Sequence, residues 1–439
     1  MNTNRISFAE EFGDAKVAIN VLNSWRHGGV SKALKTLDEF GSANPLVGKM
    51  PLIRELNARL SGEPGPRLLI DGLWFSRAHG GITRVWEQIL SCWLLPGMFS
   101  SAAPIQLIDR DSKLWQSSRF HCHHGAVIDP LDLNRIEALE AENVAIAQQW
   151  GADVFLSSWI STCGGSNSIC RQLALVHDCL PERSCPDQQL LNLRRRWLSG
   201  ASGHLAVSKA TAQDLEGLLC KPSGTIPWCH SAPGITLVDA YSQAASDVMW
   251  KRLRQRMGLK TPFVLLPATS CIGSYKNPEL VAAALDHPAM QSVHLVICGV
   301  AADQCRCEIE DRFTSLVGRI TAAGFSDQEL VLIYRHALAV VIPSRIEGFG
   351  LPVIEALASG GNVLVADARG LREAGGEAAM RFHPDHPSRL RCLLELFLHN
   401  QSRDAFATVL NRRRQQRLHR LHPDFIGLSL LVLARQLSQ

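Results

Sequence analysis

The sequence predicts an α/β protein with two domains, each built on a parallel sheet. Short runs rich in valine, isoleucine and leucine alternate with segments of helical periodicity, which is the pattern of parallel strands joined by helices. The alternation begins near residue 67 and starts again near residue 262, and glycine turns follow several strands. With 439 residues, of which 46% are hydrophobic, the chain can fill two sizeable cores.

Residues 1–66 are expected to form an N-terminal helical extension. DAKVAINVLNSW and SKALKTLDEF carry apolar residues at helical spacing, and MPLIRELNARLSG ends on glycine. The sequence GEPGP then interrupts the pattern before the first strand.

Residues 67–249 are expected to form the first Rossmann-like domain. Strands are predicted at RLLIDGLW (67–74), DVFLSS (153–158), LALVHD (173–178) and the start of GHLAVSKATAQDLEGLL (203–219). In the last of these, Ser208 is a candidate cap of the following helix. HGGITRVWEQILSCWL predicts a glycine turn that leads into a helix.

Residues 250–423 are expected to form the second Rossmann-like domain. The basic stretch WKRLRQRMGLKTP (250–262) is interpreted as the linker that opens it. Predicted strands PFVLLPAT, SVHLVICG, LAVVIPS and NVLVAD alternate with predicted helices. The tail, residues 424–439, is expected to be an amphipathic helix.

The segment PSRIEGFGLPVIEALASG (343–360) predicts a glycine turn between a buried strand and a helix that starts near Pro352. The N–H groups of Gly350 and Leu351 would point out of the helix N-terminus, where anions and phosphates bind. Glu347 lies in the turn and Glu355 lies about one helical turn into the helix. A phosphate cradle between two carboxylates suits a ligand with both phosphate and hydroxyl groups; solvated acids on a structural turn are the alternative.

Composition excludes several other classes of function. The net charge of +4 is mild and no nucleic-acid-binding signature appears. No apolar run approaches the roughly 20 residues of a membrane span, and the first residues lack a secretory signal. The 13 scattered cysteines favour free thiols in the cytoplasm. HCHH (121–124) has no second ligand pair at zinc spacing, so no metal site is expected there.

Residues 326–385, which include the two glutamates and the GFGLP turn, closely resemble the core of the retaining glycosyltransferases of family 4. The resemblance implies the GT-B fold, with two Rossmann-like domains facing across a cleft. It also implies that the final helix, residues 424–439, returns to the first domain. Residues 1–66 lie outside the resemblance.

Weaker similarities extend it over much of residues 67–400. SYKNPELVAAAL (274–285) resembles the Lys-Asn motif for the donor phosphates, and HGGITRV (79–85) resembles the first glycine loop. LVHDCLPE (175–182) resembles a His-Asp at a strand end, and AVSKATAQDL resembles a helix start of the family.

The resemblance implies how the second domain would hold a sugar donor. Glu355 resembles the acid that binds the ribose hydroxyls, and Glu347 resembles the acid that contacts hydroxyls of the donor sugar. The backbone amides of Phe349, Gly350 and Leu351 would bind sugar hydroxyls or phosphate.

The resemblance also implies roles for Lys276 and for the first domain. Lys276 resembles the cation that binds the diphosphate, and His177 would lie beside the reacting sugar. Gly80 and Gly81 would let the first domain's backbone approach the diphosphate or the acceptor. Glu347, His177 and Lys276 are therefore the expected catalytic residues.

The implied chemistry needs no metal or other cofactor. A lysine and a helix N-terminus can compensate the charge that grows on the leaving nucleoside diphosphate. In the family's favoured mechanism, the leaving phosphate accepts the proton of the attacking hydroxyl on the same face of the sugar. Glu347 then orients the sugar and does not attack it.

One feature departs from the family. Its members usually carry an arginine beside Lys276 or a few residues before it, whereas this chain has Tyr275 and Ser270 at those places. Arg84 and Arg183 are candidates to replace that cation.

The expected function is therefore a retaining hexosyltransferase that uses a nucleotide-diphosphate sugar. GDP-mannose is favoured and UDP-hexoses remain open; the acceptor is a glycan or lipid-linked hydroxyl. A non-catalytic sugar- or nucleotide-binding module and a nucleotide-sugar epimerase are the alternatives. NRRRQQRLHR (411–420) and LRRRWL (193–198) could bind anionic lipid at the inner membrane face, or could be solvated helix faces.

Overall fold

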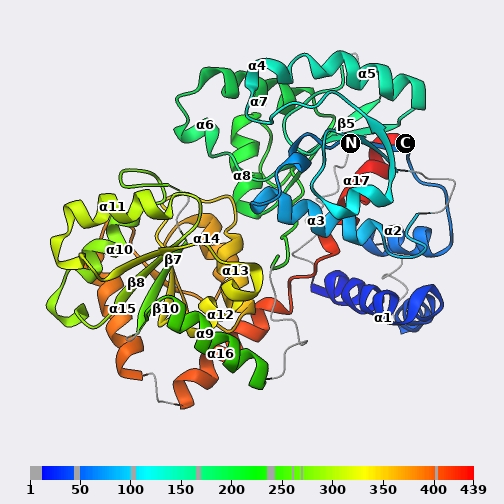
Figure 1. The fold of residues 1–439 in the computed structure, drawn as a ribbon. Coiled ribbons are helices and arrows are strands. Elements are labelled where there is room, and N and C mark those ends of the chain that lie inside the picture. Colours follow the sequence, from blue (N-terminus) through cyan, green and yellow to red (C-terminus); the bar gives the residue numbers. More distant parts are fainter. Residues whose placement is uncertain are drawn as a thin grey trace. The chain divides into compact units, whose positions relative to one another are not determined.

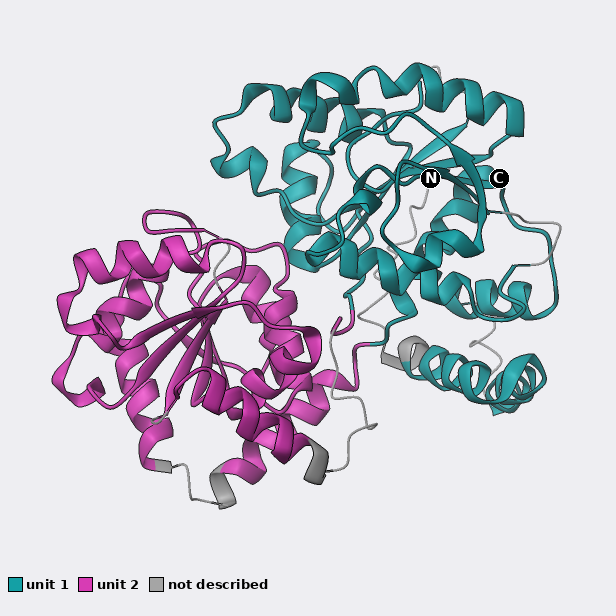
Figure 2. Cartoon of the chain, viewed as in Figure 1, with its two compact units in different colours: residues 1–231, 422–439 teal, residues 232–421 magenta. Residues whose placement is uncertain are grey.

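The chain forms two compact units (Figures 1 and 2). The computed structural model describes residues 12–43, 50–99, 105–164, 170–234, 243–259, 262–267, 270–400 and 404–439. The first unit comprises residues 1–231 with 422–439, and the second comprises residues 232–421. The first eleven residues of the expected helical extension lie outside the described residues. Within the described ranges, no helix is long and apolar enough to cross a membrane.

The first unit contains a six-stranded parallel sheet in the order β3-β2-β1-β4-β5-β6. Its strands are β1 (Leu68–Asp71), β2 (Ile105–Asp109), β3 (His121–His124), β4 (Val154–Ser157), β5 (Arg171–Val176) and β6 (Gly203–Ala206). Every residue of β1 and β4 is buried, as expected of a parallel sheet covered on both faces. The sequence pattern missed β2 and β3; the cluster HCHH forms β3, the edge strand.

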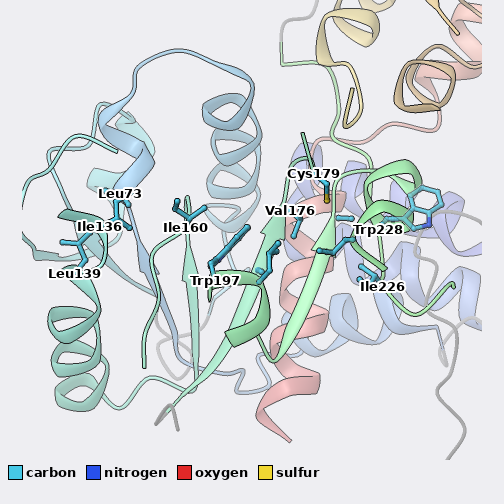
Figure 3. Close-up of a cluster of buried hydrophobic side chains, with 14 of the residues drawn as sticks. Leu73, Ile136, Leu139, Ile160, Val176, Cys179, Trp197, Ile226 and Trp228 are labelled. Carbon is cyan, nitrogen blue, oxygen red and sulfur yellow. The ribbon is translucent and has the colours of Figure 1, made fainter. Parts of the chain in front are cut away.

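Helices cover both faces of this sheet. They are α3 (Gly81–Trp93), α4 (Leu133–Ile136), α5 (Leu139–Trp150), α6 (Pro181–Ser184), α7 (Gln188–Gly200) and α8 (Lys209–Leu218), with 3-10 turns η2 (Leu73–Ser76) and η3 (Trp115–Arg119). The expected cap is present, because the side chain of Ser208 accepts a hydrogen bond from the Thr211 N–H at the start of α8. Figure 3 shows part of the core, a cluster of buried side chains that includes Trp197 of α7, Val176 of β5 and Ile160.

The helical extension is confirmed over the described residues. It consists of α1 (Phe12–Ala43), which kinks at Gly29 where φ is 73°, and α2 (Pro51–Leu60). Both helices belong to the first unit. The Trp25 indole of α1 donates a hydrogen bond to the Pro96 carbonyl at 2.7 Å, which ties the extension to the loop after α3.

The last helix, α17 (Phe425–Ser438), packs in the first unit against α2, α3 and the strands β4, β5 and β6. It was expected to be amphipathic, but every residue from Phe425 to Ala434 is buried. A helix that is apolar on all sides belongs inside a core, and the extension supplies the cover that the sequence pattern could not reveal.

Two ion pairs join this buried helix to the extension. Arg26 of α1 binds the fully buried Asp424 just before α17. Glu55 of α2, only 2% exposed, bonds both Arg59 at 2.7 Å and Arg435 of α17 at 2.5 Å. The two arginines share one carboxylate, so Glu55 links α2 to the end of the chain.

A buried polar network lies where β1 and β2 end. The Arg110 guanidinium bonds the carboxylate of Asp71 at 2.6 Å, and both side chains are fully buried. Arg110 also bonds Glu142 at 2.6 Å, Asn143 at 2.9 Å and the Ala126 carbonyl at 2.8 Å. Each nitrogen of the guanidinium therefore has a partner within the fold.

The second unit contains another six-stranded parallel sheet, in the order β12-β11-β10-β7-β8-β9. Its strands are β7 (Phe263–Pro267), β8 (His294–Cys298), β9 (Ile320–Ala323), β10 (Ala339–Ile342), β11 (Val363–Ala366) and β12 (Met380–Phe382). Its helices are α9 (Gln243–Arg256), α10 (Pro278–Leu285), α11 (Ala302–Arg312), α12 (Asp327–His336), α13 (Leu351–Ala358), α14 (Arg369–Gly375), α15 (Pro387–Asn400) and α16 (Asp404–Leu418), with 3-10 turns η5 (Pro288–Met290) and η6 (Thr314–Leu316).

The segment interpreted as a linker is largely helical. Residues 250–256 belong to α9, which lies inside the second unit and packs on α12. The Trp250 ring stacks on His336 at 4.1 Å and on Phe263 at 6.2 Å. This aromatic packing fixes α9 against α12. The polar, basic sequence of α9 did not distinguish it from a linker. The expected boundaries of the functional domains remain predictions.

The two sheets have the same topology, which confirms the predicted fold class of two Rossmann-like units. Counted along the chain within each unit, both strand orders are 3-2-1-4-5-6. In such sheets, ligands bind at the carboxyl ends of the strands where the order reverses. The reversal lies between β1 and β4 in the first unit and between β7 and β10 in the second.

Candidate functional site

The second unit carries an ion pair at its point of strand reversal. Lys276 follows β7 and Glu347 follows β10, and these strands are neighbours in the sheet. The ammonium of Lys276 lies 2.7 Å from a carboxylate oxygen of Glu347. Their side chains are 21% and 13% exposed, so the pair remains accessible to a ligand.

The charge on Lys276 is stable. Burial lowers its pKa, but attraction to Glu347 and Tyr275 outweighs that effect, so the pKa of Lys276 lies above its ordinary value. The ammonium also lies 5.1 Å from the centre of the Tyr275 ring, within the range of a cation–π contact. Lys276 therefore remains a cation throughout the physiological pH range.

Asn277 fixes the backbone beside this lysine. It caps α10 in the left-handed conformation, with φ of 55°, and is 1% exposed. Its side-chain amide donates to the carbonyls of Pro343 at 3.3 Å and Pro384 at 2.8 Å. One amide thereby joins the segments that follow β7, β10 and β12.

Two glycines, Gly350 and Gly370, allow the turn before α13 to pack closely against α14. Gly350 caps α13 with φ of 118°, and a Cβ there would lie 2.9 Å from the Leu371 side chain. A Cβ on Gly370 of α14 would lie 2.3 Å from the carbonyl oxygen of Glu347. Gly370, which the sequence analysis missed, lets α14 press against the turn that carries Glu347. Phe349, within the same turn, is buried, and Leu351 is the first residue of α13.

Glu355 lies inside α13 and is only 3% exposed. The Tyr334 hydroxyl of α12 donates to its carboxylate over 3.4 Å. Burial, with a smaller contribution from the negative charge of Glu355, raises the pKa of the Cys298 thiol at the end of β8 to about 12. The carboxylate therefore lies near the carboxyl end of β8, the neighbour of β7.

The first unit contributes a different group of predicted residues. Gly80 and Gly81 are exposed at the start of α3, and Gly80 adopts φ of 135°, which an L side chain rarely accepts. They follow β1 and η2, at the carboxyl edge of the sheet. The exposed backbone here can approach a ligand without hindrance from a side chain.

His177 follows β5 at the same edge of the first sheet. Burial, with a smaller contribution from repulsion by Arg194, lowers its pKa to about 3. The imidazole is therefore neutral at physiological pH. Its Nε2 atom is buried and has no hydrogen-bond partner among the described residues, so it retains the capacity for one hydrogen bond.

In the two basic segments, residues 193–198 and 411–420, four of the eight arginines have structural roles. Arg194 is 3% exposed, bonds both carboxylate oxygens of Glu182 at 2.5 and 3.1 Å, and bonds the Asp178 carbonyl. Arg196 pairs with Glu137 and Glu140. In α16, Arg414 and Arg417 donate to backbone carbonyls.

The structure thus groups the predicted residues by unit. Lys276, Glu347, Phe349, Gly350, Leu351 and Glu355 gather at one edge of the second sheet, whereas Gly80, Gly81 and His177 lie in the first unit. Arg84 and Arg183 also lie in the first unit, and Arg183 pairs with Asp214 at 2.5 Å. Among the residues whose placement is described, no group of three or more His, Cys, Asp or Glu side chains could hold a metal ion.

Comparisons with known proteins show which family and which fold the chain resembles. The model of the family described as glycosyl transferases group 1 matches residues 252–413, inside the second unit. The chain is 38% identical over 77 residues to the MMP alpha-(1->4)-mannosyltransferase of Mycolicibacterium hassiacum, covering 17% of this chain and 19% of that protein. It is 27% identical over 180 residues to the D-inositol 3-phosphate glycosyltransferase of Xylanimonas cellulosilytica, covering 38% of this chain and 42% of that protein.

The alignments therefore span less than half of these relatives, whereas the fold matches over most of both chains. The structure of Anabaena HepE in complex with UDP-glucose superposes with a TM-score of 0.60 at 17% identity, covering 84% of this chain and 98% of that one. The chain has the GT-B fold, and the match to the glycosyl transferases group 1 model is confined to residues 252–413.

Proposed function

We propose that the protein is a retaining glycosyltransferase that moves a hexose from a nucleotide-diphosphate sugar to a hydroxyl group. The observation that carries the proposal is the pair of Lys276 and Glu347 beside the N-terminus of α13, at the strand reversal of the second sheet. A cation and a helix N-terminus suit a diphosphate, and a neighbouring carboxylate suits the hydroxyls of a sugar.

In this proposal each residue performs one task. Lys276 and the amides at Phe349, Gly350 and Leu351 stabilise the charge that develops on the leaving diphosphate. Glu347 orients the sugar, and the buried Glu355 binds the ribose hydroxyls. The neutral His177 offers its unsatisfied ring nitrogen to the reacting sugar, and the exposed Gly80–Gly81 backbone approaches the diphosphate or the acceptor.

The bonds and protons balance without a further co-reactant. The bond between the anomeric carbon and the diphosphate oxygen breaks, and the acceptor oxygen forms its bond on the same face. The leaving phosphate takes the proton of the acceptor hydroxyl. The chain's residues supply binding and electrostatic stabilisation, and we propose that the reaction needs no metal.

Mannose is the favoured sugar and GDP-mannose the favoured donor. One relative is named a mannosyltransferase, whereas a protein with the same fold is named as a complex with UDP-glucose, so UDP-hexoses are the competing donors. The proposed acceptor is a glycan or lipid-linked hydroxyl of cell-surface polysaccharide synthesis. The exposed arginines of the basic segments, such as Arg195, Arg412 and Arg413, would bind the cytoplasmic face of the membrane in this proposal.

A thermal-shift screen against GDP, UDP and their sugars, with and without EDTA, tests the proposal. We expect one nucleoside diphosphate to raise the melting temperature, because a ligand that binds only the folded state stabilises it. Slow hydrolysis of the matching donor should persist in EDTA. A chain that binds the donor without turning it over is a binding module, and one that converts it to another nucleotide sugar without acceptor is an epimerase; either result would refute the proposal.

A further inference from the structure

The charge of Lys276 is already balanced within the protein. Its ammonium bonds the carboxylate of Glu347 at 2.7 Å, so the pair together carries no net charge. A nucleotide-diphosphate sugar brings a negative charge on each of its two phosphates. With a second cation near Lys276, the charge of the diphosphate could be neutralised while Glu347 binds the hydroxyls of the sugar.

Arg345 is placed to be that cation. Its backbone N–H donates to the Tyr275 carbonyl at 2.8 Å, and its guanidinium contacts the Asn277 side-chain oxygen at 3.4 Å. The arginine therefore touches the residues on both sides of Lys276. It also lies two positions before Glu347, in the same turn after β10.

The guanidinium is held by a partner that a ligand can replace. Arg345 pairs with Asp385, and the two side chains are 42% and 54% exposed. The hydrogen bond from Arg345 is the largest of the effects that hold the pKa of Asp385 below its usual range. Exposed ion pairs contribute little to stability, whereas a phosphate offers the planar guanidinium two parallel hydrogen bonds.

Two other exposed arginines of the second unit lie near a different strand end. Arg372 and Arg381 approach Asp367, at 3.2 and 4.0 Å, where β11 ends. In the sheet, β11 is separated from β7 by β10. Arg345, by contrast, follows β10, which is the direct neighbour of β7.

We infer that Arg345 is a second phosphate-binding cation of the donor site, and that it exchanges Asp385 for a donor phosphate when the nucleotide binds. The inference rests on the proposed function, because it assumes a nucleoside-diphosphate ligand. It assigns to the second unit the charge that the sequence had suggested for Arg84 or Arg183 of the first. Asn277 acts as the positioning residue that holds the Arg345 and Lys276 segments together.

Calorimetric titration of the full chain with GDP and UDP, and with guanosine and uridine, tests the inference. Arg345→Gln should weaken binding of the preferred diphosphate about 10-fold, the effect of one lost charge-assisted hydrogen bond, and leave binding of the matching nucleoside unchanged. Arg345→Lys should restore part of the loss. Arg256→Gln is the matched control, because Arg256 forms an exposed pair with Glu329 in the same unit; it should bind as the wild type does.

Asp385→Asn separates the ligand role from a structural one. If Asp385 binds Arg345 only while the donor site is empty, loss of its negative charge should leave diphosphate binding unchanged or tighten it. If the Arg345–Asp385 pair merely supports the loop, Asp385→Asn will weaken binding as Arg345→Gln does, and the inference falls. It also falls if Arg345→Gln weakens nucleoside and diphosphate equally. A folded wild type that binds no nucleoside diphosphate would overturn the proposed function, and the inference with it.

Discussion

The two units place an ion pair at corresponding edges of sheets with the same strand order, but the pairs differ in their surroundings. In the first unit, Asp71 ends β1 and Arg110 directly follows the neighbouring strand β2, and both side chains are fully buried. In the second, Lys276 and Glu347 also follow neighbouring strands, yet both side chains are partly exposed. The carboxyl edge of a parallel sheet therefore hosts a structural ion pair in one unit and a candidate ligand-binding pair in the other.

The number of partners explains this difference. Arg110 bonds two carboxylates, an amide and a backbone carbonyl, and all lie inside the fold. Removing one member of such a buried network strongly destabilises the fold, because it leaves a buried charge without its partner. Lys276 has one carboxylate partner and an aromatic neighbour, so a ligand can join it without displacing the core.

The largest effect is expected from breaking the buried pair. Arg110→Met should lower the free energy of unfolding by about 3–5 kcal/mol, because Asp71 would remain buried without its counter-charge. Chemical denaturation measures the change. Lys113→Met removes an exposed partner of Asp111 and should change stability by less than about 1 kcal/mol. Equal losses in the two variants would refute the structural reading of Arg110.

The accessible pair should affect the reaction more than the stability. Lys276→Ala should lower kcat by about 10²–10³, as removal of one oxyanion-hole donor does, because charge grows on the leaving group in the transition state. Lys276→Arg should restore activity only in part, since a planar fork does not replace a point charge. Steady-state kinetics would contradict this role if the KM for the donor rose while kcat stayed constant.

Acid sensitivity should be concentrated in the first unit. Burial is the main cause that lowers the pKa of His177 to about 3 and those of His204 and His422 to about 4. As the pH falls below about 6.5, the unfolded state gains protons first, and each such group removes about 1.4 kcal/mol of stability per pH unit until its folded pKa is reached.

His177→Asn tests one of these contributions. The variant should lose about 2 kcal/mol less stability than the wild type between pH 7 and pH 5. Chemical denaturation at the two pH values measures the difference. The same change at His419, which is exposed in the second unit, should leave the wild-type pH dependence intact; an equal effect there would contradict a special burial of His177.

The smallest effect is expected from the carboxylate inside α13. Glu355→Gln should weaken nucleoside-diphosphate binding about 10-fold through the loss of one charge-assisted hydrogen bond to the ribose. The isosteric amide should fold normally, and its melting temperature without ligand is the control. Unchanged affinity would remove Glu355 from the site.

Local pattern and residue chemistry were sufficient to predict much of the second unit. Its apolar strands, the GFGLP turn and the Lys-Asn segment placed Glu347 after a strand, Lys276 just before a helix and Glu355 inside a helix. The pattern did not reveal β3, because HCHH is an exposed edge strand without an apolar signature. Nor did it separate the arginines of LRRRWL, since the partner of Arg194 is Glu182, in another helix.

The sequence by itself determined the class of fold and the types of residue at the candidate site, because helix and strand periods, glycine turns and short motifs are local properties. Tertiary structure alone decided which charges lie in the core and which remain accessible. The pairing of Glu55 with Arg435, of Arg26 with Asp424, and of Lys276 with Glu347 joins residues far apart in the chain. Burial and charge pairing depend on such distant neighbours, so no local pattern could have shown that α2 and α3 pack against α17 or that Arg345 contacts the residues on both sides of Lys276.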